Sequence, residues 1–110
     1  MSKILIVDDE KSIRITLSEF LKKEGHSVSV ASDVEEAISI FNEGNFDIVI
    51  TDIVMPKRPG TELLKYVREH SQSVQVVIMT GEPTVDTAIQ SVQSGANDYL
   101  TKPIQKDVFL

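Results

Sequence analysis

Short apolar segments alternate along the chain with segments in which apolar residues recur at helical spacing. The short segments are apolar or β-branched and are bounded by polar or turn residues, which predicts five strands at residues 4–7, 27–31, 48–51, 74–79 and 99–101. Between them, apolar positions three or four residues apart predict four helices, with Gly25, Gly44 and Gly95 as stop signals after the first, second and fourth. The apolar positions are Ile13, Leu17, Phe20 and Leu21; Val34, Ala37, Ile38 and Phe41; Leu63, Leu64 and Val67; and Val85, Ala88, Ile89 and Val92.

This alternation of strand and helix implies right-handed βαβ units and a parallel sheet with helices on both faces. Residues 48–50 and 76–79 are continuously apolar, which is typical of central strands, whereas residues 27–30 alternate between polar and apolar, which suits an edge strand. We therefore expect an α/β fold with a doubly wound, five-stranded parallel sheet in the flavodoxin-like order 2-1-3-4-5.

Two helix starts are also suggested by the sequence. Ser32 and Glu35 have the spacing of a capping box before the second helix. Pro83 suits the first turn of the fourth helix.

Polar side chains follow the apolar strands at one consistent end. Asp8 and Asp9 come after the first strand and Asp52 after the third, while Thr80 and Lys102 follow the fourth and fifth. In an open parallel sheet, ligands bind in the crevice beyond the carboxyl ends of the strands. If the first and third strands are neighbours, the three aspartates converge within a few ångströms.

Three carboxylates so close together repel one another and need a counter-charge. A hard divalent cation supplies it: Mg²⁺ fits the residue types, but carboxylates alone do not select Mg²⁺ over Mn²⁺ or Ca²⁺. With Lys102 as a fixed positive charge and the Thr80 hydroxyl as a donor, such a site suits a transferring phosphoryl group, and Asp52 stands apart from the pair as the candidate nucleophile. The structural alternatives are that Asp8 and Asp9 cap the first helix and that Thr80 merely ends a strand.

Composition narrows the function classes. The chain of 110 residues suits one domain, and its net charge of −6, with a pI near 4.8, argues against direct nucleic-acid binding. It contains no cysteine, which excludes disulfides and thiolate chemistry and agrees with a reducing compartment. Asp8 and Asp9 interrupt the first apolar stretch, so we expect neither a signal peptide nor a membrane span, and a cytoplasmic location.

Four stretches together resemble a receiver domain of a two-component response regulator, of the chemotaxis or nitrogen-regulation type. They are ILIVDDE (4–10), DIVITDIVMP (47–56), VIMTG (77–81) and GANDYLTKP (95–103), and they occur in the family's order over nearly the whole chain. The resemblance implies that residues 1–110 form one receiver domain. It also implies that Asp52 accepts a phosphoryl group from a histidine kinase or phosphotransfer protein.

The resemblance further assigns a role to each residue around Asp52. Asp8 and Asp9 become the acidic metal pair, with Asp52 and the backbone carbonyl of Val54 as further ligands of Mg²⁺. Thr80 becomes the switch hydroxyl, Tyr99 the switch aromatic and Lys102 the phosphate-pairing lysine. The implied function is a phosphorylation-activated signalling switch that controls an output domain or effector protein through the surface around the fourth helix and fifth strand. The domain is then no enzyme beyond its own phosphorylation and dephosphorylation.

Several positions depart from the commonest family pattern. Val54 and Glu82 flank the expected route of hydrolytic water, so the phosphate lifetime stays open, and Pro59 is unusual before Gly60. The family normally ends with a fifth helix, of which residues 106–110 provide only the first turns. We expect that the natural chain continues beyond Leu110; the alternative is that another molecule covers the exposed apolar surface, with a homodimer through the terminal segment as one outcome.

Two alternative functions remain. A phosphohydrolase of the haloacid-dehalogenase type also uses Mg²⁺, a threonine and a lysine. Such an enzyme would carry a D-x-D nucleophile motif after the first strand, whereas this chain has adjacent Asp8 and Asp9 there. A pseudo-receiver would bind partners without phosphate, although every site residue is present here.

Overall fold

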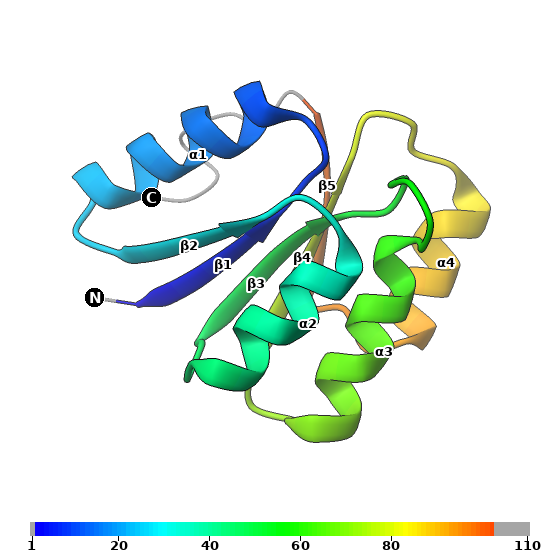
Figure 1. Ribbon diagram of the computed structural model, residues 1–110. Coiled ribbons are helices and arrows are strands. Elements are labelled where there is room, and N and C mark those ends of the chain that lie inside the picture. Colours follow the sequence, from blue (N-terminus) through cyan, green and yellow to red (C-terminus); the bar gives the residue numbers. More distant parts are fainter. Residues whose placement is uncertain (1, 103–110) are drawn as a thin grey trace.

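The computed structural model describes residues 2–102, within which five parallel strands alternate with four helices (Figure 1). The strands are β1 Lys3–Val7, β2 Ser27–Ala31, β3 Ile48–Asp52, β4 Gln75–Thr80 and β5 Asp98–Thr101. The helices are α1 Lys11–Lys23, α2 Val34–Glu43, α3 Gly60–His70 and α4 Val85–Gln93. The strand order β2-β1-β3-β4-β5 confirms the predicted doubly wound sheet. β4 begins and ends one residue later than predicted, which makes Thr80 its last residue.

Helices cover both faces of the sheet. In Figure 1, α1 lies on one face, and α2, α3 and α4 lie on the other. Val49 and Ile50, at adjacent positions of β3, are 0% and 1% exposed, so this strand is buried on both faces as its apolar run predicts. Val30 on β2 is 40% exposed, in agreement with the edge position expected from its alternating pattern.

Two helix starts differ from the sequence prediction. The N-cap of α2 is Asp33 rather than Ser32, and the Asp33 carboxylate accepts a hydrogen bond of 2.8 Å from the backbone N–H of Glu36. A charged acceptor beside the positive end of the helix dipole favours this later start. Pro83 precedes α4 instead of lying in its first turn, because Thr84 is the N-cap and forms a reciprocal capping box with Thr87.

The predicted first turns of a fifth helix, at residues 106–110, lie outside the described residues. None of the helices within residues 2–102 has the length and apolar character needed to cross a membrane.

Arg68 joins three parts of the fold by hydrogen bonds to backbone and side-chain oxygens. From the last turn of α3, its guanidinium donates to the carbonyl oxygen of Gly95 at 2.8 Å, to the carbonyl oxygen of Val74 before β4, and to Asn97 Oδ1. Asn97 Oδ1 also accepts from the N–H of Val76, so the network continues into β4. Burial lowers the pKa of Arg68, because it disfavours the charged guanidinium. The carbonyl oxygens offset this desolvation cost by accepting hydrogen bonds from the guanidinium N–H groups.

We expect Arg68→Ala to lower the free energy of unfolding by about 2–3 kcal/mol, because it removes charge-assisted hydrogen bonds. Arg58 is the matched control: its ion pair with Glu62 is exposed, at 2.9 Å, and Arg58→Ala should cost less than about 1 kcal/mol. Urea denaturation of both variants measures the difference. Equal losses would contradict the role assigned to Arg68.

Candidate functional site

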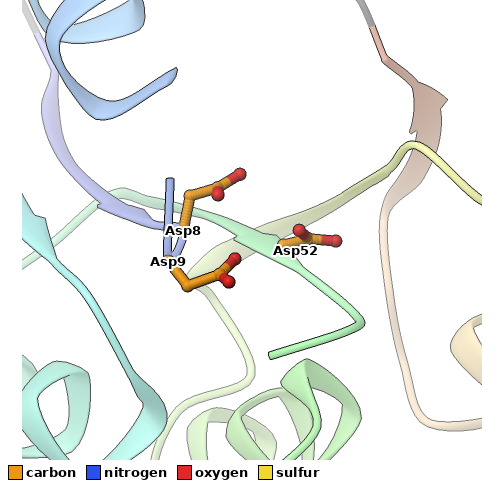
Figure 2. A group of neighbouring side chains, drawn as sticks. All are labelled: Asp8, Asp9 and Asp52. Carbon is orange, nitrogen blue, oxygen red and sulfur yellow. The ribbon is translucent and has the colours of Figure 1, made fainter. Parts of the chain in front are cut away.

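The three aspartates at the carboxyl ends of β1 and β3 meet at one edge of the sheet. β1 and β3 are hydrogen-bonded neighbours with Val7 opposite Thr51, so Asp8 and Asp52 follow at the same level. One carboxylate oxygen from each of Asp8, Asp9 and Asp52 lies within 4.8 Å of the others, and Figure 2 shows the three side chains around this edge. Asp8 and Asp52 are buried, whereas Asp9 is exposed. The structure therefore brings together the carboxylates that the sequence predicted to converge.

Lys102 places its ammonium between the two buried carboxylates. Its Nζ lies 2.8 Å from Asp8 Oδ2 and 2.9 Å from Asp52 Oδ2, and 3.6 Å from the more exposed Glu10. Burial alone would lower the pKa of Lys102, but the carboxylates of Asp8 and Asp52 outweigh it and raise that pKa well above its usual value. The lysine is therefore a permanent cation within this cluster.

Burial raises the pKa of Asp52. The hydrogen bond and charge of Lys102 act against that rise, while the negative charge of Asp8 adds to it. Around Lys102, the acids outnumber the single ammonium, so part of their negative charge is not compensated by other groups of the described residues.

Asp8 Oδ2 is buried and, within residues 2–102, has no hydrogen-bond donor of suitable geometry, although the Lys102 ammonium is 2.8 Å away. We regard this contact as an ion pair whose angle is poor for a hydrogen bond, which leaves the oxygen with unused acceptor capacity. Three convergent carboxylates with such an oxygen fit a hard divalent cation that prefers oxygen ligands.

A hollow of about 380 Å³ opens beside this cluster. It is lined by Asp9, Glu10, Asp52, Val54, Thr80, Gly81, Glu82 and Lys102. Sequence reasoning did not place Glu10 in the site, although its position directly after Asp8 and Asp9 was a usable signal.

Thr80 ends β4 within this hollow. It is 1% exposed, and its Oγ1 accepts a hydrogen bond of 3.1 Å from the N–H of Glu82. The Thr80 carbonyl oxygen also accepts a hydrogen bond of 2.8 Å from the backbone N–H of Lys102. The backbone segments that carry the Thr80 hydroxyl and the Lys102 ammonium are therefore hydrogen-bonded to each other.

Tyr99 lies apart from the carboxylates. It is half-buried on β5, opposite Ile78 of β4, and its hydroxyl lies 2.8 Å from Thr87 Oγ1 of α4. Of the predicted site residues, it is the one that faces α4 rather than the hollow.

Gly60 is a positional requirement of the site that the sequence pattern did not reveal. A Cβ atom at this position would lie 1.8 Å from the backbone oxygen of Asp52, and the Gly60 N–H donates to the Ile53 oxygen at 2.8 Å. The loop after β3 can therefore return to the sheet only because residue 60 has no side chain.

Comparison with known proteins identifies the family. The family model of the response regulator receiver domain matches residues 4–110. The chain belongs to the response regulator receiver domain family. Receiver domains are signalling modules of two-component systems and bind Mg²⁺ at an acidic aspartate cluster, and Asp8, Asp9 and Asp52 form an acidic group in this chain.

Relatives of the receiver domain agree in sequence and structure. This chain is 34% identical over 108 residues to the transcriptional regulatory protein DltR of Streptococcus agalactiae. The match covers 98% of this chain but 48% of DltR. The chemotaxis protein CheY4 of Vibrio cholerae superposes with a TM-score of 0.93 at 33% identity, covering 99% of this chain and 92% of CheY4. The response regulator TrrA of Thermotoga maritima, solved in complex with Mg²⁺ and BeF, superposes with a TM-score of 0.89 at 34% identity, covering 99% and 93%. The receiver domain thus spans about half the length of DltR.

Gly60→Ala should destabilise the receiver domain by about 1–3 kcal/mol, because the new methyl group forces the Asp52 backbone and the loop apart. Gly81→Ala is the control: a Cβ there meets its nearest atom, in Lys102, at 3.8 Å, an ordinary contact. Thermal or urea unfolding compares the two. A Gly60→Ala variant as stable as Gly81→Ala would contradict the close approach.

In metal-free buffer, Asp52→Asn should increase stability at pH 7. The folded-state pKa of Asp52 is raised, so its contribution to stability is fully present below the unfolded-state pKa and is lost as pH rises through the folded-state value. The advantage of the variant should therefore shrink as the pH falls into the acid range. Urea denaturation from pH 3 to pH 7 measures it, with the exposed α4 residue Asp86→Asn as control. A variant less stable than the unsubstituted chain at pH 7 would contradict the sign.

Proposed function

We propose that this receiver domain is a phosphorylation-activated switch in which Asp52 accepts a phosphoryl group from a phosphohistidine. The donor is a histidine kinase or a phosphotransfer protein. The observation that carries the proposal is the meeting of Asp8, Asp9 and Asp52 with Lys102 and Thr80 around one hollow. A carboxylate oxygen of Asp52 would bond to phosphorus as the bond from phosphorus to the imidazole nitrogen breaks.

The position of Asp52 supports its role as the nucleophile. Its carboxylate borders the hollow, whereas Asp8 is fully buried behind it at 0% exposure. The N–H of Val54 lies 3.4 Å from Asp52 Oδ1, a weak contact that leaves this oxygen with little competition for an incoming phosphorus.

Asp8, Asp9, Asp52 and the backbone carbonyl of Val54 would hold Mg²⁺, and Mn²⁺ also suits these oxygen ligands. The bound cation supplies positive charge that offsets the repulsion between Asp52 and a phosphoryl group. The solved complex of TrrA with Mg²⁺ and BeF supports this assignment.

Lys102 and Thr80 would bind the new phosphoryl oxygens. The Lys102 ammonium already touches Asp52 Oδ2, and it needs only a small movement to pair with a phosphoryl oxygen. The Thr80 hydroxyl accepts from the Glu82 N–H in the resting domain, so its proton is available for donation to the phosphoryl group.

The added group carries roughly −1.5 to −2 charge and three strong acceptors. We expect it to draw Thr80 and Lys102 inward, so that Tyr99 turns toward the space behind Thr80 and the surface of α4 and β5 changes. That surface would then be read by an output domain or a separate effector protein. Apart from its own phosphorylation and dephosphorylation, the domain would catalyse nothing.

The chain spans 48% of DltR, which is named a transcriptional regulator, so an output domain is the partner we favour. With a net charge of −6, this segment itself is unsuited to direct nucleic-acid contact. A cytoplasmic location accords with this role, and a homodimer through the terminal segment stays a prediction because that segment lies outside the described residues. Family membership argues against the phosphohydrolase. A phosphorylation experiment distinguishes the proposed phosphoacceptor from a pseudo-receiver.

Incubation with Mg²⁺ and acetyl phosphate should add one phosphoryl mass increment to the chain. Asp52→Asn should abolish the adduct, and the exposed control Asp86→Asn should retain it. Removal of the cation with a chelator should slow its formation. Repeated turnover of a phosphate ester without an adduct would support the phosphohydrolase instead, and no adduct under any condition would support the pseudo-receiver.

A further inference from the structure

The helix α4 has few buried anchors. Its only buried residue is Ser91, near its end, and three aliphatic side chains remain largely in solvent: Val85 at 75%, Ile89 at 50% and Val92 at 69% exposure. Within residues 2–102, one side-chain hydrogen bond joins this helix to the sheet, between Thr87 Oγ1 and the Tyr99 hydroxyl at 2.8 Å. The attachment of the first turn of α4 to β5 therefore depends strongly on this contact.

The Thr87 hydroxyl also belongs to the capping box of α4. Its Oγ1 accepts from the N–H of Thr84 at 3.2 Å and lies 3.1 Å from the Thr84 carbonyl oxygen and 2.9 Å from Thr84 Oγ1. A hydroxyl has one proton and two lone pairs. If the Thr87 hydroxyl donates its proton to the Thr84 carbonyl oxygen and accepts the Thr84 N–H with one lone pair, its other lone pair is left to accept the Tyr99 hydroxyl proton. Tyr99 is then the donor, and it completes the bonding capacity of Thr87.

We propose that Thr87 is a positioning residue that holds Tyr99 against α4 in the resting domain and couples the Tyr99 side chain to the N-terminal cap of that helix. This inference rests on the proposed switch and specifies how its signal reaches α4. When Tyr99 turns away, Thr87 Oγ1 no longer accepts a hydrogen bond from the Tyr99 hydroxyl. This bond is also the side-chain hydrogen bond between the first turn of α4 and β5. Loosening should therefore begin at residues 85–88, while the end of the helix stays anchored by Ser91.

The test uses the Tyr66→Phe background, because the chain has two tyrosines and no tryptophan, so Tyr99 becomes the only tyrosine. Nuclear magnetic resonance of the labelled tyrosine ring reports the Tyr99 orientation, and amide hydrogen exchange reports the first turn of α4. Thr87→Val removes the hydroxyl while keeping the branched shape, and Thr87→Ser keeps the hydroxyl. Thr84→Val is the matched control, because it removes the cap acceptor of the Thr87 N–H and leaves the partner of Tyr99 in place.

In the unphosphorylated domain, Thr87→Val should shift the Tyr99 orientations by on the order of two- to tenfold, the ratio that corresponds to one neutral hydrogen bond. Thr87→Ser should restore the original ratio. Thr84→Val should speed exchange at residues 85–88 with a much smaller effect on Tyr99. Tyr99→Phe removes the same bond from the other side, so adding it to Thr87→Val should increase exchange no further. Identical Tyr99 signals in Thr87→Val and Thr87→Ser would overturn the proposal.

A second arm adds Mg²⁺ and acetyl phosphate while mass spectrometry follows the adduct. Phosphorylation should move the Tyr99 signal and speed exchange at residues 85–88 together. An adduct without these changes would overturn the coupling and leave the phosphoacceptor function intact. Failure to form an adduct would instead overturn the proposed function, and the comparison of Thr87→Val with Thr87→Ser in the resting domain would still decide the role of Thr87.

Discussion

The burial of Asp8 and Asp52 side by side is the constraint on which the rest of the structure depends. Two carboxylates with almost no solvent access cannot both stay ionised without a cation, and Lys102 supplies one at 2.8 Å and 2.9 Å. One ammonium cannot balance these two acids and the neighbouring Asp9 and Glu10. The remaining negative charge is what makes the hollow suited to a divalent cation, and through it to a phosphoryl group.

The ion pairs of Lys102 with Asp8 and Asp52 connect the site to β5 at the edge of the sheet. Lys102 comes directly after β5, and its backbone N–H binds the carbonyl oxygen of Thr80 at the end of β4. Any group that attracts the ammonium therefore pulls on both strands. Tyr99, three residues before Lys102 on β5, has its hydroxyl 2.8 Å from Thr87 Oγ1 on α4. Charge at the carboxyl edge is thus connected to a weakly buried helix by backbone and hydroxyl contacts.

Backbone packing beneath Asp52 limits how the site can vary. The loop from Ile53 to Gly60 leaves the sheet and returns so closely that a methyl group at residue 60 would meet the Asp52 oxygen. On the opposite side of the cluster, Asp8 Oδ1 accepts from the N–H of Glu10 at 2.8 Å. Asp8 therefore also shapes the backbone just before α1, but it does not cap that helix: the N-cap is Glu10, and no side chain of the described residues accepts a capping hydrogen bond there. Rigid backbone on both sides holds the carboxylates close despite their repulsion.

The sequence by itself determined the five strands, the edge position of β2 and the meeting of the aspartates with Thr80 and Lys102. It could do so because periodicity records which face of each element is buried, and parallel strands all end at one edge. Only the tertiary structure decided which polar groups pair: Asp33 as the cap of α2, Arg68 with the ends of α3, β4 and β5, and Thr87 with Tyr99. A hydrogen bond depends on tenths of an ångström between separately packed elements, and no pattern along one chain segment carries that distance.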